Sequence, residues 1–464
     1  MSVIAAYAVP HPPLIIPAIG MGREKTIVAT VRAYHETMRA AGELRPDTVV
    51  IISPHATAYD DFFHISPGAG TEGNFAAFGH PEISVGIQYD EEFVRVLSAV
   101  TEENDVPAGT LGEKNSVLDH GTMIPLFFLS EYLGDTPTKF VRIGISGLPA
   151  HTHALLGQSI AAAAERLGRR VICIASGDLS HRLAEDGANG FAPEGAEFDA
   201  LCTSFMKTGD FLSLLQIPGS FAETAGHCGL NGLWVLAGAL DCAALDANLH
   251  SYEGPFGVGY AVASFTVTGR DEEHDYAAQL VRAEDAAIAE LRAAEHDYVR
   301  LARESIEHHV RTHTYLPLPE ELPASLETRA GAFVSIKKYG RLRGCIGTFV
   351  PMRRCLAEEI LYNAVSAALH DSRFEPIEEN ELNRLVYSVD VLSAPEPISS
   401  AADLDPKRYG VIVKSLRDAR QGLLLPDLPG IDTVEQQIAI AREKAYIQPK
   451  EQVSLARFTV IRYC

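Results

Sequence analysis

A run of mostly β-branched side chains, Thr48–Ser53, constrains the fold more than any other stretch of this sequence. Branching at Cβ favours strands, and the run is too short for a helix of a globular protein. Pro54 and His55 follow directly, and the residue before a proline avoids helical backbone, so the strand must stop on a turn. A continuous apolar run is typical of a parallel strand buried on both faces. Ligands of such sheets bind beyond the carboxyl ends of the strands, which places His55 where chemistry is expected.

Four other stretches end a strand-like segment with an imidazole or a carboxylate in the same manner. They are Val9-Pro10-His11, Asp119-His120-Gly121, Ser176-Gly177-Asp178-Leu179-Ser180-His181 and Tyr252-Glu253-Gly254. One such ending is unremarkable, whereas five at the same edge of a sheet predict a shared functional site.

Residues 1–270 alternate short β-branched runs with segments of helical apolar spacing. The expected strands are Val3–Ala8, Thr48–Ser53, Phe140–Ile145, Arg170–Ser176 and Gly257–Thr268. The expected helices are Glu24–Ala41, Glu91–Val100, His153–Leu167, Glu197–Lys207 and Cys228–Leu240, and the Gly/Pro-rich stretch Ser66–Pro81 is expected to be a loop. This alternation predicts an α/β fold with a mixed, mostly parallel sheet and helices on both faces.

The segment Asp271–Thr314 contains neither proline nor glycine and is rich in Ala, Glu, Arg and Leu, so it predicts one long helix or two consecutive ones. Beyond it we expect strands at Gly331–Lys337 and Arg384–Leu392, a glycine-rich turn, and a helix at Leu356–Leu369. These elements do not alternate regularly, which predicts a smaller α+β domain. The expected organisation is a first domain over residues 1–272, a helical linker over 273–294 and a second domain over 295–464.

Charge and cysteine content exclude several classes of protein. The 39 basic and 61 acidic residues give a net charge of −22, and no dense Lys/Arg run occurs, so neither nucleic acid nor an anionic membrane is an expected partner. The seven cysteines are scattered and form no C-x-x-C, which fits a reducing cytoplasm better than a disulfide framework. No apolar run approaches the roughly 20 residues needed to span a bilayer.

Two histidines and one carboxylate that meet on one face can hold a divalent first-row metal and leave positions open for substrate and dioxygen. The best candidates are His11, His55 and Glu253. Imidazole suits iron, and a catecholate could then bind the metal with both oxygens. His120 and His181 would exchange protons, because imidazole titrates near neutrality. Each histidine alone also fits a hydrogen-bonded turn residue.

Asp178 lies three residues before His181, so it could orient that imidazole, although the capping of a turn is the interpretation we favour. For the thiol in His227-Cys228-Gly229 the sequence predicts a helix start with a buried cysteine.

In the second half, Cys345 lies between two glycines and beside Arg341 and Arg343. Nearby cations favour the thiolate, so Cys345 is a candidate nucleophile. A tight glycine-framed turn with a space-filling cysteine explains the same residues equally well.

In this order, Pro10-His11-Pro12, Ser53-Pro54-His55, Asp119-His120-Gly121, the His181 stretch and Glu253 resemble the class III extradiol ring-cleavage dioxygenases and the related MEMO family. The resemblance covers residues 1–270. It implies His11, His55 and Glu253 as Fe(II) ligands, His181 as an acid or base near bound oxygen, and His120 at the substrate. MEMO proteins carry a cysteine near the third ligand position, and Glu253 corresponds to the choice of the dioxygenases.

The stretch Leu342-Arg343-Gly344-Cys345-Ile346-Gly347, with Asp371-Ser372-Arg373-Phe374 after it, looks like the AMMECR family, over residues 295–464. A MEMO-like and an AMMECR-like domain in one chain resemble the AmmeMemoRadiSam set, whose third member is a radical-SAM protein. This chain has no C-x-x-x-C-x-x-C for such a cluster, so that activity would come from a separate partner.

Together these observations predict an Fe(II)-dependent extradiol-type dioxygenase that acts on a catecholic or related aromatic substrate with O2. Copper or another divalent ion is the alternative metal. The alternative function is a MEMO-like metal-binding or redox accessory protein that works with a radical-SAM partner. The resemblance of the first domain also implies a homo-oligomer.

Overall fold

The computed structural model describes residues 2–134, 137–428 and 430–464. The chain forms two compact units, Met1–Ala283 and Glu284–Cys464. The division between them falls inside helix α10 (Tyr276–Ala294), which belongs to the glycine-free and proline-free segment. A second helix, α11 (Asp297–Thr312), follows directly, as expected for two consecutive helices.

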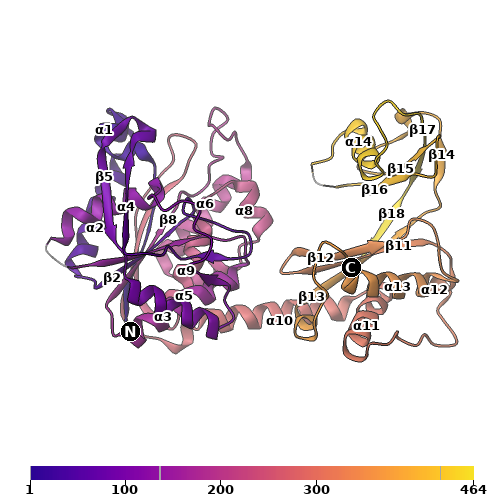
Figure 1. The fold of residues 1–464 in the computed structure, drawn as a ribbon, viewed down its shortest axis with the longest axis horizontal. Coiled ribbons are helices and arrows are strands. Elements are labelled where there is room, and N and C mark those ends of the chain that lie inside the picture. The colour runs from indigo at the N-terminus through magenta and orange to yellow at the C-terminus, as the bar shows by residue number, and fades with distance from the viewer. Residues whose placement is uncertain (1, 135–136, 429) are drawn as a thin grey trace. The chain divides into compact units, whose positions relative to one another are not determined.

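The first unit is built on a six-stranded sheet in the order β7-β2-β8-β1-β10-β9 (Figure 1). The strands are β1 (Val3–Val9), β2 (Thr48–Ser53), β7 (Lys139–Gly144), β8 (Val171–Ser176), β9 (Ala243–Glu253) and β10 (Tyr260–Arg270). The first four are parallel, and β10 and β9 join antiparallel to their neighbours. The carboxyl ends of β1, β8 and β2 therefore lie side by side.

Helices cover both faces of this sheet, which is why β2 is buried along its whole length. Val49 and Ile51 pack into one core with α2 (Val28–Glu43) and α4 (His120–Leu133). Val50 and Ile52 pack into a second core on the opposite face. The long helices that pack into this second core include α3 (Glu91–Glu103), α5 (Ala150–Leu167), α6 (Pro193–Thr208) and α9 (Leu230–Ala239). The predicted α/β class is confirmed.

One local prediction for the first unit is wrong, and two elements were not predicted. The stretch expected to be a loop, Ser66–Pro81, belongs in part to a hairpin of β4 (Gly70–Phe75) and β5 (His80–Gln88). Helix α4 was not expected, because it is apolar on nearly all sides and contains Pro125. The edge strand β9 was also missed, and its mixture of small and polar residues gives no β-branched run.

The second unit contains two antiparallel sheets with helices packed on them. The first has the order β12-β11-β13-β18, from β11 (Gly331–Lys338), β12 (Arg341–Gly347), β13 (Leu385–Leu392) and β18 (Val460–Tyr463). The second has the order β14-β17-β15-β16, from β14 (Glu396–Ile398), β15 (Gly410–Ser415), β16 (Gln421–Leu424) and β17 (Val453–Phe458). Helices α11 and α13 (Leu356–Leu369) cover the first sheet, and α14 (Val434–Lys444) covers the second. The α+β prediction is confirmed, and a turn at Tyr339-Gly340 joins β11 to β12, but the segment around Cys345 is strand β12 rather than a turn.

An ionised carboxylate, Glu381, ties this first sheet to the short helix η5 (Glu379–Arg384). Its oxygens accept hydrogen bonds from Lys338 Nζ at 2.8 Å and from Arg343 Nη2 at 2.8 Å. Burial alone would raise the pKa of Glu381, but these two cations outweigh it and lower the pKa to about 2. The carboxylate therefore stabilises the fold above the pKa of an unfolded glutamate, about 4.3, and loses that contribution as the pH falls toward 2.

We expect Glu381→Gln to lower the free energy of unfolding by about 1.5–3 kcal/mol at pH 7, the usual size for hydrogen bonds to charged groups. The difference from the wild type should shrink between pH 4.3 and 2, as thermal melts at a series of pH values would show. Glu379→Gln is the control, because that side chain is 70% exposed and its ion pair with Arg311 should contribute little. An equal loss in both variants, or a loss independent of pH, would contradict this role of Glu381.

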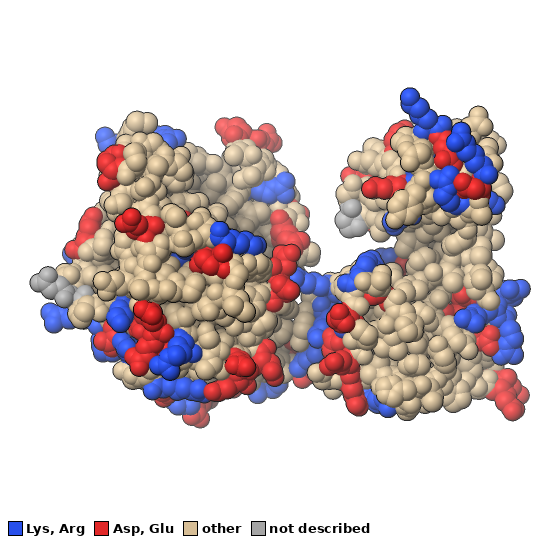
Figure 2. Space-filling view, in the orientation of Figure 1, with Lys and Arg blue, Asp and Glu red and all other residues tan. Residues whose placement is uncertain are grey.

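On the face seen in Figure 2, acidic and basic side chains are interspersed over the first unit, without a continuous basic surface. None of the described helices combines the length and the apolar character that crossing a bilayer requires.

Candidate metal centre

Three imidazoles meet beyond the carboxyl ends of the parallel strands. His11 follows β1, His55 follows β2, and His120 is the first residue of α4. His55 Nε2 lies 3.1 Å from His11 Nε2, and the His55 and His120 rings stack with centroids 4.3 Å apart. One ring nitrogen from each of the three lies within 4.8 Å of the others, so together they could hold a metal ion. The structure thus brings together three of the residues that the sequence singled out.

Hydrogen bonding fixes which nitrogen of His11 carries its proton. Pro125 has no N–H and leaves the carbonyl of Gly121, four residues earlier in α4, without its helical donor. Ser176 Oγ donates to that carbonyl instead, at 2.5 Å. Because its proton is used there, the Ser176 oxygen can only accept from His11 Nδ1, 3.0 Å away. His11 Nε2 is then the unprotonated nitrogen, and it faces His55.

Burial favours the neutral form of His11 and His120. It lowers the pKa of His11 to about 3 and that of His120 to about 4, and the nearby His55 acts in the same direction. Neutral imidazole is the form that binds metals. His55 itself is exposed, so the cluster is open to solvent on its side.

A thiol and a carboxyl group also lie at this site; the sequence analysis did not place Cys228 here, and for Asp178 it favoured the capping of a turn. Cys228 Sγ lies 3.5 Å from His11 Nε2, and His11, Asp178 and Cys228 form a second group that could hold a metal. Asp178 Oδ1 accepts a hydrogen bond from the His11 backbone N–H at 2.9 Å, so it anchors that histidine rather than only capping a turn. Burial raises the pKa of Asp178 to about 6 and the pKa of the Cys228 thiol well above its usual value. In the sequence, the feature that could have pointed to Cys228 as a site residue is the histidine beside it at the start of a helix.

His181 lies beside this group on the loop after β8. Burial lowers its pKa, which Asp178 opposes and His55 reinforces. Its Nε2 is buried and has no hydrogen-bond partner among the residues that the structure describes. A buried polar atom of this kind costs free energy unless a ligand or solvent satisfies it. His227 is a further neighbour, and its pKa is lowered to about 4 by burial and by the nearby His181. Its ring stacks on that of Phe198 with centroids 5.0 Å apart.

Glu253 is not part of this cluster, which corrects its assignment as the third metal ligand. Its Oε2 accepts hydrogen bonds from the Thr30 backbone N–H and from Thr30 Oγ1, both at 2.7 Å, near the start of α2. Among the described residues, no group close enough to share an ion contains Glu253. The physical reason is the sheet order, because β10 separates β9, which ends at Glu253, from β1.

In the second unit, Cys345 lies on β12 in a network of polar contacts. Its sulfur accepts a hydrogen bond from Ser335 Oγ at 3.2 Å, and its backbone N–H donates to Asp371 Oδ2 at 2.9 Å. Arg373 binds both the Cys345 carbonyl and the Asp371 carboxylate. This geometry fits a structural thiol that is fixed by its hydrogen bonds as well as it fits a reactive thiol. The catalytic role of Cys345 therefore stays a prediction.

Comparison with known proteins divides the chain in the same way as its structure. Residues 5–263 match the family model described as the catalytic LigB subunit of aromatic ring-opening dioxygenase, and residues 299–463 match the AMMECR1 model. Protein CA_C1420 of Clostridium acetobutylicum is 35% identical over 476 residues, which cover 100% of this chain and 99% of that protein.

A protein of Thermotoga maritima is 49% identical over 172 residues, 36% of this chain and 98% of the relative. Among solved structures, the uncharacterized protein JW3007 from Escherichia coli K12 is 16% identical, with a TM-score of 0.37 over 56% of this chain and 99% of that one.

Proposed function

Because this chain belongs to the LigB family through residues 5–263 and carries an AMMECR1 domain at 299–463, we propose that its first domain is a metal-dependent oxidoreductase that opens a small aromatic diol with dioxygen. The observation that carries this proposal is the convergence of His11, His55 and His120 beside Cys228 at the carboxyl edge of the sheet.

The donor atoms fit a first-row metal ion. Two imidazole nitrogens bound about 2.1 Å from one ion lie roughly 3.0–3.4 Å apart, depending on the geometry. The Nε2 atoms of His11 and His55 are 3.1 Å apart, and the lone pair of His11 Nε2 points into this space. Cys228 or His120 would supply the third donor. When bound, the metal would supply Lewis acidity to the hydroxyl oxygens of the substrate. We favour Fe(II), with copper or another divalent ion as the alternative.

The residues around the donors would bind the substrate and move its protons. His181 Nε2 is buried and free among the described residues, so it would take the proton of a substrate hydroxyl. The ring of Phe78 lies 5.6 Å from that of His120 and is 38% exposed, so the two would form an aromatic wall for a flat substrate.

Cys228 favours a second candidate function. A soft thiolate in place of a hard carboxylate suits a redox-active or copper-binding site, as in an accessory protein that works with a separate radical-SAM partner.

One experiment separates these two functions. The protein is loaded anaerobically with Fe(II), catechol or protocatechuate is added, air is admitted, and oxygen uptake and the yellow ring-fission product are followed. We expect turnover by the wild type and none by His181→Asn, which should still hold its iron because the His11, His55 and Cys228 side chains are unchanged. Iron retention by the wild type without oxygen uptake for any diol would contradict the dioxygenase and favour the accessory function.

A further inference from the structure

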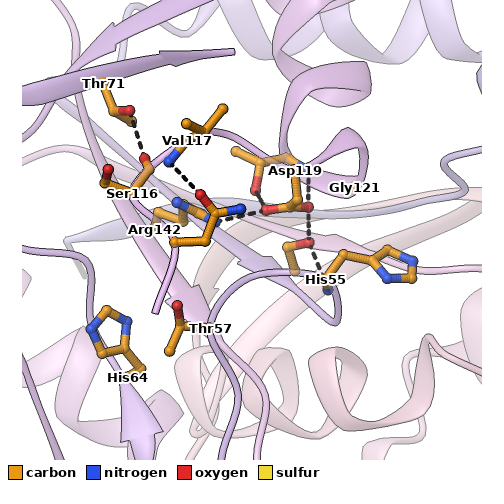
Figure 3. A network of polar contacts seen from close by, with 12 residues as sticks. His55, Thr57, His64, Thr71, Ser116, Val117, Asp119, Gly121 and Arg142 are labelled. Carbon is orange, nitrogen blue, oxygen red and sulfur yellow. Dashed lines mark hydrogen bonds and ion pairs between the residues drawn. The ribbon is translucent and has the colours of Figure 1, made fainter. Parts of the chain in front are cut away.

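The Asp119 carboxylate, whose side chain is 9% exposed, faces Arg142 close to His55 (Figure 3). It accepts hydrogen bonds from the side chains of Ser53 and Thr122 and forms an ion pair with Arg142. Its Oδ1 accepts from Ser53 Oγ at 2.6 Å and from the Thr122 backbone N–H at 2.9 Å. Its Oδ2 accepts from Thr122 Oγ1 at 2.8 Å and lies 3.1 Å from Arg142 Nη2. All four interactions require Asp119 to act as an acceptor, which is the property of an ionised carboxylate.

Asp119 is linked to each of the three imidazoles through the backbone. Ser53 Oγ, which donates to Asp119, accepts from the His55 backbone N–H at 3.2 Å. Asp119 is also the N-cap of α4, and the first residue of that helix is His120. The next residue, Gly121, presents the carbonyl that fixes Ser176 and thereby His11. One carboxylate therefore contacts the backbone beside His55 and His120, and through Gly121 and Ser176 it is linked to the His11 ring.

The partner of this carboxylate is a buried guanidinium. Arg142 comes from β7, beside β2, and is only 1% exposed. Its Nε and Nη1 have no hydrogen-bond partner within residues 2–134, 137–428 and 430–464, so the contact through Nη2 to Asp119 is its main polar anchor. A guanidinium stays protonated in proteins, so Arg142 and Asp119 form an ion pair near the carboxyl end of β2.

We propose that Asp119 and Arg142 are positioning residues of the metal site, which hold His55 and His120 at the spacing that an ion requires. This inference rests on the proposed function, since it takes the imidazoles as ligands. Groups behind metal ligands commonly contribute about 10–100-fold to metal affinity, because they orient the ligands before the metal binds.

The chain offers a matched control at the opposite end of β2. Asp90 is fully buried, caps α3 through the Phe93 backbone N–H at 3.1 Å, and accepts from Thr48 Oγ1 at 2.6 Å. It also faces a guanidinium, Arg169, at 3.5 Å. Asp90→Asn therefore removes the same kind of helix cap and charge beside the same strand, but at the end away from the imidazoles.

The test uses the full chain and Co(II) alone as the probe, with the affinity measured by competition against a chelator and the coordination by the visible spectrum. We expect Asp119→Asn and Ser53→Ala to weaken Co(II) binding about 10–100-fold and to alter the spectrum. Asp90→Asn should lower the melting temperature but leave the affinity and the spectrum unchanged. Arg142→Lys, which keeps the charge, should weaken binding less than Arg142→Met.

Wild-type affinity and spectrum in Asp119→Asn and Ser53→Ala would overturn this inference, as would an equal loss in Asp90→Asn. If Asp119→Asn does not fold, Ser53→Ala decides the question by itself, because it cuts only the link to His55. Failure of the wild type to bind Co(II) would overturn the proposed metal site and this inference with it. Normal wild-type binding with unaffected variants would overturn only the inference.

Discussion

Replacing His11 by alanine is expected to abolish iron retention by the first domain. His11 is 2% exposed, and its Nε2 faces both His55 Nε2 and Cys228 Sγ, so it is the one donor shared by the two candidate metal groups of this site. Its loss should weaken metal binding by more than the roughly 100-fold typical of changes behind the ligands. The measurement is the iron content after anaerobic loading with Fe(II) and removal of unbound metal.

The informative comparison is Glu253→Gln. Glu253 accepts hydrogen bonds from Thr30 and lies outside both metal groups, so this variant should retain iron like the wild type. It should instead lower the stability by about 1–3 kcal/mol, because the Thr30 N–H and hydroxyl keep weaker partners. Iron retained by His11→Ala would contradict the metal centre described above, and iron lost from Glu253→Gln would restore the carboxylate as a ligand.

The fold of the first domain could be predicted because the apolar sequences of its central strands show that these strands are buried. In β2 every residue is buried, with Val49 and Ile51 on one face and Val50 and Ile52 on the other, so a continuous run of β-branched side chains fits a strand covered on both faces. Since parallel strands end at one edge, the convergence of His11 and His55 followed from the same pattern.

The remaining donors could not be found in this way, because their positions depend on long-range packing. Cys228 precedes α9, and only the contact of its loop with Asp178 brings its thiol to His11. Glu253 ends a strand at the correct edge of the sheet, but the sequence does not show that β10 intervenes or that Thr30 binds its carboxylate.

Helix α4 shows how a local irregularity can serve the site. The sequence does not predict this helix, because it contains Pro125 and is apolar on nearly all sides, without the spacing of an amphipathic helix. In the structure the same proline frees the Gly121 carbonyl for Ser176, which in turn orients His11. A feature that disfavours the helix locally thus fixes the protonation of a candidate ligand.

Gly238→Ala is expected to cause a large loss of stability in the first domain. Helices α5 and α9 approach so closely that a Cβ at Gly238 would lie 1.7 Å from the Ala154 carbonyl oxygen. Gly157 makes the reciprocal contact from α5, where a Cβ would lie 2.0 Å from the Val235 carbonyl oxygen. Backbone atoms cannot rotate away as a side chain can, so the helices must separate and loosen the core beneath them.

Overpacking of this kind costs about 3 kcal/mol or more, which corresponds to a fall in melting temperature of roughly 6–12 °C in a domain of this size. Scanning calorimetry would measure it, with Gly219→Ala as the control. Gly219 is also helical, at the start of α8 (Gly219–Ala225), but a Cβ there meets nothing within 4 Å, so the melting temperature should be unchanged. Because α9 follows Cys228 directly, Gly238→Ala should also weaken metal binding, whereas a stable variant with normal affinity would show that this helix contact is not needed to place the thiol.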